Sequence, residues 1–100
     1  MELINLNDRA RYAHTFSPQI LRMTQTYKTP LICMNPGQAI EPHASGTGVF
    51  YFVSGKGVMT VDGEEREVGA GDMVFVDKGQ ERGIRATEKL MAFAVHVTAG

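Results

Sequence analysis

The sequence predicts an all-β fold, most simply a jelly-roll barrel of short antiparallel strands. No window carries the sustained apolar stripe of an amphipathic helix. Short runs of β-branched and aromatic residues alternate instead with clusters of Gly, Pro, Asn and Asp, which is the pattern of strands joined by turns. The chain contains 11 glycines and 4 prolines, and these divide it into pieces of strand length. Closing such strands into a barrel removes most exposed sheet edges.

About nine strands are expected along the chain. An Asn-Pro-Gly turn at residues 35–37 separates the second strand from the third, and a Gly-containing turn at residues 54–57 separates the fourth from the fifth. A further turn at residues 69–72 precedes a short apolar run. The expected strands span residues 19–27, 30–34, 38–43, 49–53, 57–61, 64–68, 73–76, 80–85 and 89–98.

The hairpin at residues 57–68 is the clearest local signal. Asp62 and Gly63 supply the two residues of positive φ that a tight type I′ turn needs. Residues 64–68, which form its second strand, are almost entirely charged, as is typical of a sheet edge with one face in water. We therefore assign these acidic residues to solvation and expect the strand at a sheet edge.

The run at residues 49–53 is apolar at every position, so we expect both of its faces to be buried. A second sheet or a second subunit must then cover the outer face. For a chain of 100 residues, this favours a homodimer. Residues 1–30 form N-terminal strands or an arm, whose apolar residues pack on the barrel or on the partner.

Composition excludes several classes of partner. Ten Lys and Arg residues against eleven Asp and Glu residues give a net charge of -1, which argues against nucleic acid. No apolar run approaches the roughly 20 residues of a membrane-spanning helix, and the N-terminus lacks the pattern of a secretory signal. The one cysteine, Cys33, cannot form an intrachain disulfide. We expect a single domain over residues 1–100 in the reducing cytoplasm.

Two glycine-spaced motifs carry a family resemblance. In the first, five residues separate Gly37 from His43, Ser45 comes two residues later, and Gly55 ends the motif. In the second, Gly71 opens a segment that leads to Arg82. Over about residues 31–98 this spacing resembles the cupin family, whose motifs are G-x5-H-x-H-x3/4-E-x6-G and G-x5-P-x-G-x2-H-x3-N. The resemblance implies a cupin jelly-roll barrel, also called a double-stranded β-helix.

The family's metal ligands are mostly replaced in this chain. The resemblance implies that three histidines and a carboxylate hold Zn, Fe, Mn or Ni. Only His43 keeps its ligand type, because Ser45 and Arg82 stand at histidine positions and Gly48 stands at the glutamate position. A guanidinium stays protonated and repels a cation. We therefore expect no cofactor, with a divalent metal as the alternative.

The same positions predict a pocket for a small anionic molecule. The resemblance implies that His43 and Ser45 face inward, and because alternate residues of a strand share a face, Phe50, Phe52, Gln80 and Ile84 are then expected to line the same interior. An arginine fork beside a histidine suits a carboxylate or a phosphate. The expected ligand-binding residues are His43, Ser45, Gln80, Arg82, Phe50 and Phe52.

Other functions stay open at this point. One alternative is a metal-dependent enzyme of the cupin kind, a dioxygenase or an isomerase, with His43 as a ligand. In such a metal-dependent enzyme, His43, Cys33 and His96 could together form a soft metal site. A lone cysteine, however, is usually a buried apolar residue. A metal-free enzyme with a histidine as acid or base is another alternative. A partner-binding protein with a vestigial pocket is a further one.

Two residues have an ordinary structural interpretation beside the functional one. Arg82 is a rim residue paired with Glu81 or Glu41 if it does not point inward. His96 lies opposite the apolar face that Phe93 and Val95 form, which places it toward solvent or a second subunit.

Overall fold

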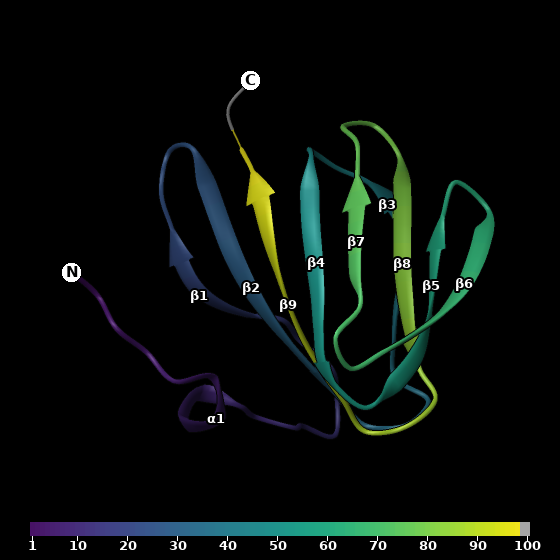
Figure 1. The fold of residues 1–100 in the computed structure, drawn as a ribbon, viewed down its shortest axis with the longest axis horizontal. Helices are drawn as coiled ribbons and strands as arrows, with labels where there is room; N and C mark the ends of the chain where they lie inside the picture. Colours follow the sequence, from purple (N-terminus) through teal and green to yellow (C-terminus); the bar gives the residue numbers. More distant parts are fainter. Residues whose placement is uncertain (99–100) are drawn as a thin grey trace.

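The computed structural model describes residues 1–98 and confirms the all-β prediction (Figure 1). A single short helix, α1 (Leu6–Arg9), precedes nine strands in this part of the chain. The strands are β1 (Gln19–Met23), β2 (Tyr27–Met34), β3 (Ala39–Ala44), β4 (Gly48–Ser54), β5 (Lys56–Val61), β6 (Glu64–Gly69), β7 (Met73–Val76), β8 (Glu81–Ala86) and β9 (Leu90–Val97).

The strands form two antiparallel sheets that face each other. One sheet has the order β1-β2-β9-β4-β7 and the other has the order β3-β8-β5-β6. In Figure 1 the hairpin β5–β6 lies at the opposite side of the molecule from β1 and β2. Among residues 1–98, none of the helical structure has the length and apolar character needed to span a bilayer.

The hairpin between β5 and β6 confirms the predicted turn and edge. Asp62 has φ of 48° and Gly63 has φ of 83°, which are the positive values that a type I′ turn requires. Val61 pairs with Glu64 across the turn, and β6 pairs only with β5. Its charged residues are exposed up to Glu67, so they face water at an open sheet edge.

The first predicted strand, residues 19–27, is wrong in its length. The hydroxyl oxygen of Thr24 accepts hydrogen bonds from the backbone N–H groups of Thr26 and Tyr27, at 3.2 and 3.1 Å. Such a bond gives the backbone an alternative to the sheet ladder, so β1 ends at Met23 and Tyr27 begins β2. β2 then continues through Pro30, where its pairs with β9 are interrupted and no N–H is needed.

The main core lies between the two sheets and follows the predicted alternation. Phe50 and Phe52 of β4 point inward and are 3% and 0% exposed, whereas Tyr51 packs outside against Phe93. The same cluster contains Leu90 of β9 and other buried residues of both sheets. Burial of this apolar surface is the main source of stability for such a fold.

A second cluster lies on the outer face of the five-stranded sheet, under the N-terminal segment. Leu31, Cys33 and Met91 are buried there, and Leu6 and Tyr12 pack against them. The chain's own N-terminus therefore covers part of the face that was expected to need a second sheet or a subunit. Polar contacts fasten this segment along its length.

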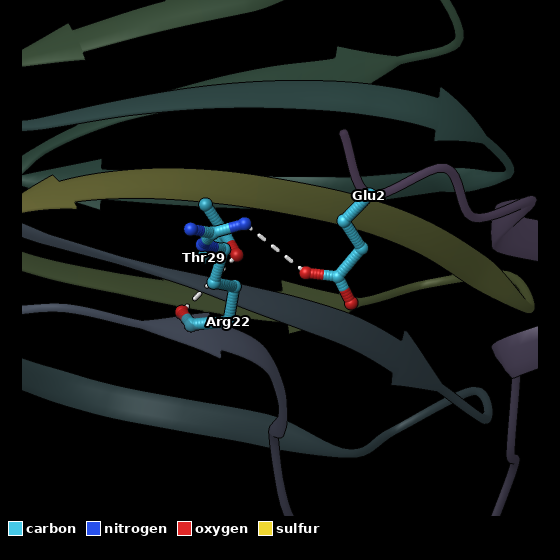
Figure 2. A network of polar contacts seen from close by, with 3 residues as sticks. All are labelled: Glu2, Arg22 and Thr29. Atoms are coloured by element: carbon cyan, nitrogen blue, oxygen red, sulfur yellow. Dashed lines mark hydrogen bonds and ion pairs between the residues drawn. The ribbon is translucent and has the colours of Figure 1, made fainter.

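The N-terminal segment is tied to β1 at two places. Figure 2 shows Arg22, which donates to the Glu2 carboxylate at 3.2 Å, while the Thr29 hydroxyl donates to the Arg22 carbonyl at 3.3 Å. The side-chain amide of Gln19 donates to the carbonyl oxygen of Arg9 at 2.8 Å. The Glu2–Arg22 pair is exposed, so its contribution to stability is small.

Cys33 is enclosed between this segment and the sheet. The residue is 3% exposed, and burial raises the pKa of its thiol. The Lys89 ammonium lies 4.3 Å from the ring centroid of Tyr12, which sits against Cys33. Cys33 is thus a core residue on the outer side of the sheet, as its ordinary interpretation predicted.

Candidate anion-binding site

Arg82 of β8 is buried and points into the barrel. The residue is 2% exposed, and its Nε donates to the carbonyl oxygen of Gln80 at 3.0 Å. Its Nη2 donates to the carbonyl oxygens of Asp77 and Ser45, at 3.2 and 3.4 Å. Nη1 is buried and has no hydrogen-bond partner among the described residues. The interpretation of Arg82 as a rim residue paired with an acid is therefore wrong.

The charge of Arg82 is incompletely compensated. Burial lowers the pKa of the guanidinium, and the nearby Asp62 raises it. Both carboxylate oxygens of Asp62 are engaged elsewhere, since they accept from the Gln80 side chain and the Glu81 backbone. An arginine remains protonated under these conditions. The unpartnered Nη1 is thus a buried cationic donor that lacks an acceptor.

His43 lies directly opposite Arg82, on the neighbouring strand β3. Its Nδ1 is 3.1 Å from the carbonyl oxygen of Glu41, and the residue is exposed. Both residues line one cavity, so the sequence prediction that brought them together agrees with their placement.

His96 of β9 also points into this cavity, which corrects its predicted position toward solvent or a partner. Both ring nitrogens are buried without a hydrogen-bond partner among residues 1–98. The ring contacts Phe50 edge-on, with the centroids 5.4 Å apart. Burial, together with the charges of Lys28, Arg82 and His43, lowers the pKa of His96 to about 4. The imidazole is therefore neutral at pH 7, with one donor and one acceptor.

Gly48 makes room for the His96 ring. The two residues are paired across β4 and β9. A Cβ atom at position 48 would lie 2.8 Å from Cδ2 and 3.3 Å from Nε2 of His96. The imidazole thus occupies the space where a longer side chain at position 48 would lie.

Replacing Gly48 with alanine is expected to push the His96 ring out of its position. Overpacking of this kind costs about 1–3 kcal/mol. Urea unfolding measures the loss, and the NMR shifts of the His96 ring protons report the movement. In a His96→Ala background the cost is expected to be smaller. An equal cost in both backgrounds would contradict the contact.

The low pKa of His96 predicts a loss of stability in acid. The unfolded chain takes up a proton at His96 near pH 6.5, whereas the folded protein does so only near pH 4. Stability is therefore lost as the pH falls through this window, by at most about 3 kcal/mol. Urea unfolding at several pH values measures the slope. His96→Gln is expected to reduce it, and His14→Gln, at an exposed position, is the control. Equal slopes for wild type and His96→Gln would refute the expectation.

The cavity has a volume of about 320 Å³ and lies between the two sheets. Four basic side chains contribute to its lining, and no acidic side chain of the described residues does. This is a strong bias for a chain with a net charge of -1. The lining residues are Phe16, Pro18, Ile20, Lys28, Pro30, Ile32, Ala39, Ile40, His43, Phe50, Arg82, Gly83, Ile84 and His96.

Three predicted ligand-binding residues lie elsewhere. Phe52 is in the main core and does not line the cavity. Gln80 precedes β8, and its side chain bonds to the Asp77 backbone and to Asp62 instead. Ser45 offers its carbonyl oxygen to Arg82 and borders a neighbouring pocket of about 300 Å³, which also contacts Lys28 and His96.

Sequence reasoning missed Phe16, Pro18 and Lys28 as cavity residues and named His96 only as a candidate metal ligand. Phe16 and Pro18 lie before β1, outside the motif region, and no spacing pointed to them. Lys28 and His96 are paired across β2 and β9. The small Gly48 paired with His96 was the available signal, because an absent side chain leaves room for a large one.

The spacing of these residues corresponds to a known family. The model of the cupin domain matches residues 30–98, well over half of the chain. The chain belongs to the cupin family. No curated protein matches this cupin.

Solved structures of other cupins share the architecture. The protein is similar to an RmlC-like cupin from Desulfovibrio desulfuricans, with 16% identity over 98% of this chain and 97% of that one, and a TM-score of 0.88. A protein from Thermus thermophilus is 24% identical over 97% and 98% of the two chains, with a TM-score of 0.87. KdgF from Halomonas is 18% identical over 87% and 88%, with a TM-score of 0.75. At these identities the likeness establishes the fold alone.

The residues of this cupin do not fit the family's metal. Among residues 1–98, no group of three His, Cys, Asp or Glu side chains is placed to hold an ion. His43 and His96 share the cavity, but Cys33 lies on the other side of the sheet, so the proposed soft site of these three is wrong. The buried Arg82 guanidinium repels a cation in the same place.

Proposed function

We propose that this cupin binds a small anionic molecule in the cavity between its sheets. The anionic group lies against Arg82 and His43, with His96 beside them. A carboxylate or a phosphate is the matching chemistry, since each offers several acceptors to a guanidinium fork.

The observation that carries the proposal is the unpartnered Nη1 of Arg82. A buried charge is costly unless it is paired, and a buried donor without an acceptor adds to that cost. The cavity lining contains no acidic side chain among the described residues that could pair with it. His96, whose two ring nitrogens are also buried without a partner among the described residues, lines the same cavity. An anionic ligand supplies the missing acceptor to both side chains.

Thermal unfolding in the presence of anions tests the proposal. Sodium benzoate and sodium phosphate are expected to raise the Tm above that in sodium chloride of equal ionic strength. A ligand at 100 times its Kd adds about 2.7 kcal/mol to the stability. If neither these anions nor a wider set of small carboxylates raises the Tm above the chloride control, the proposal is wrong.

We also propose that the protein acts as a homodimer in the cytoplasm. Val95 and Phe75 flank Val49 in register on the outer sheet face, and both are exposed, Phe75 by 71%. A second copy is the simplest cover for this apolar row. Equilibrium sedimentation measures the association. The free thiol of Cys33 accords with a reducing compartment.

A further inference from the structure

The side chains that line the cavity divide into two chemical kinds. The polar ones are Lys28, His43, Arg82 and His96, and all four are basic. They lie near one another, since Lys28 pairs with His96 across β2 and β9, His43 pairs with Arg82 across β3 and β8, and all four line one cavity. The other side chains are apolar, namely Phe16, Pro18, Ile20, Pro30, Ile32, Ala39, Ile40, Phe50 and Ile84.

Hydroxyl and amide side chains are missing from this lining. Within residues 1–98, no Ser, Thr, Tyr, Asn, Gln, Asp or Glu contributes to the cavity wall. The backbone of β2, β4, β8 and β9 offers little in their place, because each of these strands has a paired strand on both sides, whereas β1 and β3 lie at sheet edges. A ligand in this cavity therefore finds hydrogen-bonding partners at the basic cluster and apolar contact elsewhere.

We propose that the ligand is a carboxylic acid whose body is apolar and free of hydroxyl groups, such as an arylalkyl or branched alkyl carboxylate. The proposal rests on the proposed function, because the carboxylate takes the place of the anionic group at Arg82 and His43. It goes further by excluding sugar acids and sugar phosphates as the preferred class. The apolar wall receives the body of the ligand, and Phe16 and Phe50 offer aromatic faces to it.

The exclusion follows from desolvation. Each sugar hydroxyl that enters an apolar wall loses its hydrogen bonds to water and gains none, which weakens binding about ten-fold or more. A polyhydroxylated body carries several such groups, so the losses accumulate. An aromatic or alkyl body instead gains from leaving water. Sites of this size commonly combine an apolar wall with a few convergent polar groups.

Calorimetric titration of the purified chain with matched probes tests the proposal. The probes are 3-phenylpropanoate, its primary amide 3-phenylpropanamide, and gluconate, a carboxylate with a polyhydroxylated body. We expect 3-phenylpropanoate to bind at least 10-fold more tightly than either of the other two. The amide tests the anionic group, and gluconate tests the body.

Failures of the two proposals give different results. If gluconate binds as tightly as 3-phenylpropanoate, and both bind more tightly than the amide, the apolar body is refuted while anion binding stands. If the amide binds as tightly as the acid, anion binding itself is refuted, and this inference is refuted with it. If no probe binds, this inference is refuted, and the Tm series with benzoate and phosphate decides whether anion binding stands.

A variant of the apolar wall gives a second readout. Phe16→Ala is expected to weaken 3-phenylpropanoate about 10-fold while leaving the affinity for acetate unchanged. Phe16 is half-buried and precedes β1, so circular dichroism and the Tm confirm that the variant folds. Met23→Ala, at an exposed position outside the cavity and outside the proposed dimer face, is the control. Equal loss of both ligands in Phe16→Ala, or no loss of either, would remove the apolar wall from recognition.

Discussion

Replacement of Arg82 with alanine is expected to weaken binding of 3-phenylpropanoate by about 1.5–3 kcal/mol, or roughly 10- to 150-fold. The variant removes the unpartnered Nη1 donor and one positive charge from the cavity lining. Calorimetric titration measures the loss directly. Because the same side chain also donates to three backbone carbonyls, the Tm of the variant must be recorded beside its affinity.

Two further variants separate the site from general charge and from folding. Arg85→Ala removes the same charge from the same strand, but Arg85 is exposed and lines another pocket, so affinity is expected to stay unchanged. Arg82→Lys keeps the charge and loses the fork, which is expected to give an intermediate affinity. Wild-type affinity in folded Arg82→Ala would remove Arg82 from the site.

Replacement of Phe52 with alanine is expected to destabilise the protein by about 3–5 kcal/mol. The side chain is 0% exposed in the main core, so its loss removes apolar burial and leaves a cavity. A domain of this kind has a total stability of about 5–15 kcal/mol, so a large part of it is lost. The midpoint of urea unfolding measures the change.

Met23→Ala is the control for this prediction, because a large apolar side chain is removed from a position that is 69% exposed and lies outside the proposed dimer face. Its effect is expected to stay within about 0.5 kcal/mol. The comparison also decides between two roles of Phe52. A stable Phe52→Ala variant with weakened ligand binding would return Phe52 to the site and contradict its place in the core.

The glycine spacing and the strand alternation predicted most of the fold and placed His43, Arg82 and Phe50 of the candidate site at one cavity. The Asp62–Gly63 turn requires positive φ angles that few residues adopt, so the Asp-Gly dipeptide alone predicts its position. The pairing of His43 with Arg82 followed from the family motifs, because both positions face inward on neighbouring strands. Local sequence and motif spacing carry such information directly.

The predicted orientation of His96 was wrong because the inner face of β9 was assigned from the hydrophobicity of its residues. Phe93 and Val95 were assigned to the interior as the large apolar residues, yet they lie on the outer face. The inner face carries Ala92 and Ala94, which are 0% exposed. A crowded interior favours small residues, and the partly covered outer face accepts large ones. The orientation of a strand between two apolar surroundings depends on its neighbours, which the sequence of one strand does not contain.

The enclosure of Cys33 beneath Tyr12 provides a natural kinetic reporter. The thiol is 3% exposed, so a disulfide reagent reaches it only after the N-terminal segment lifts from the sheet. Because Cys33 is the one cysteine of the chain, every labelling event reports that opening without any added probe. A labelling rate far above the rate of global unfolding identifies the segment as a separate unit of local unfolding. A rate equal to global unfolding means that segment and barrel form one cooperative structure.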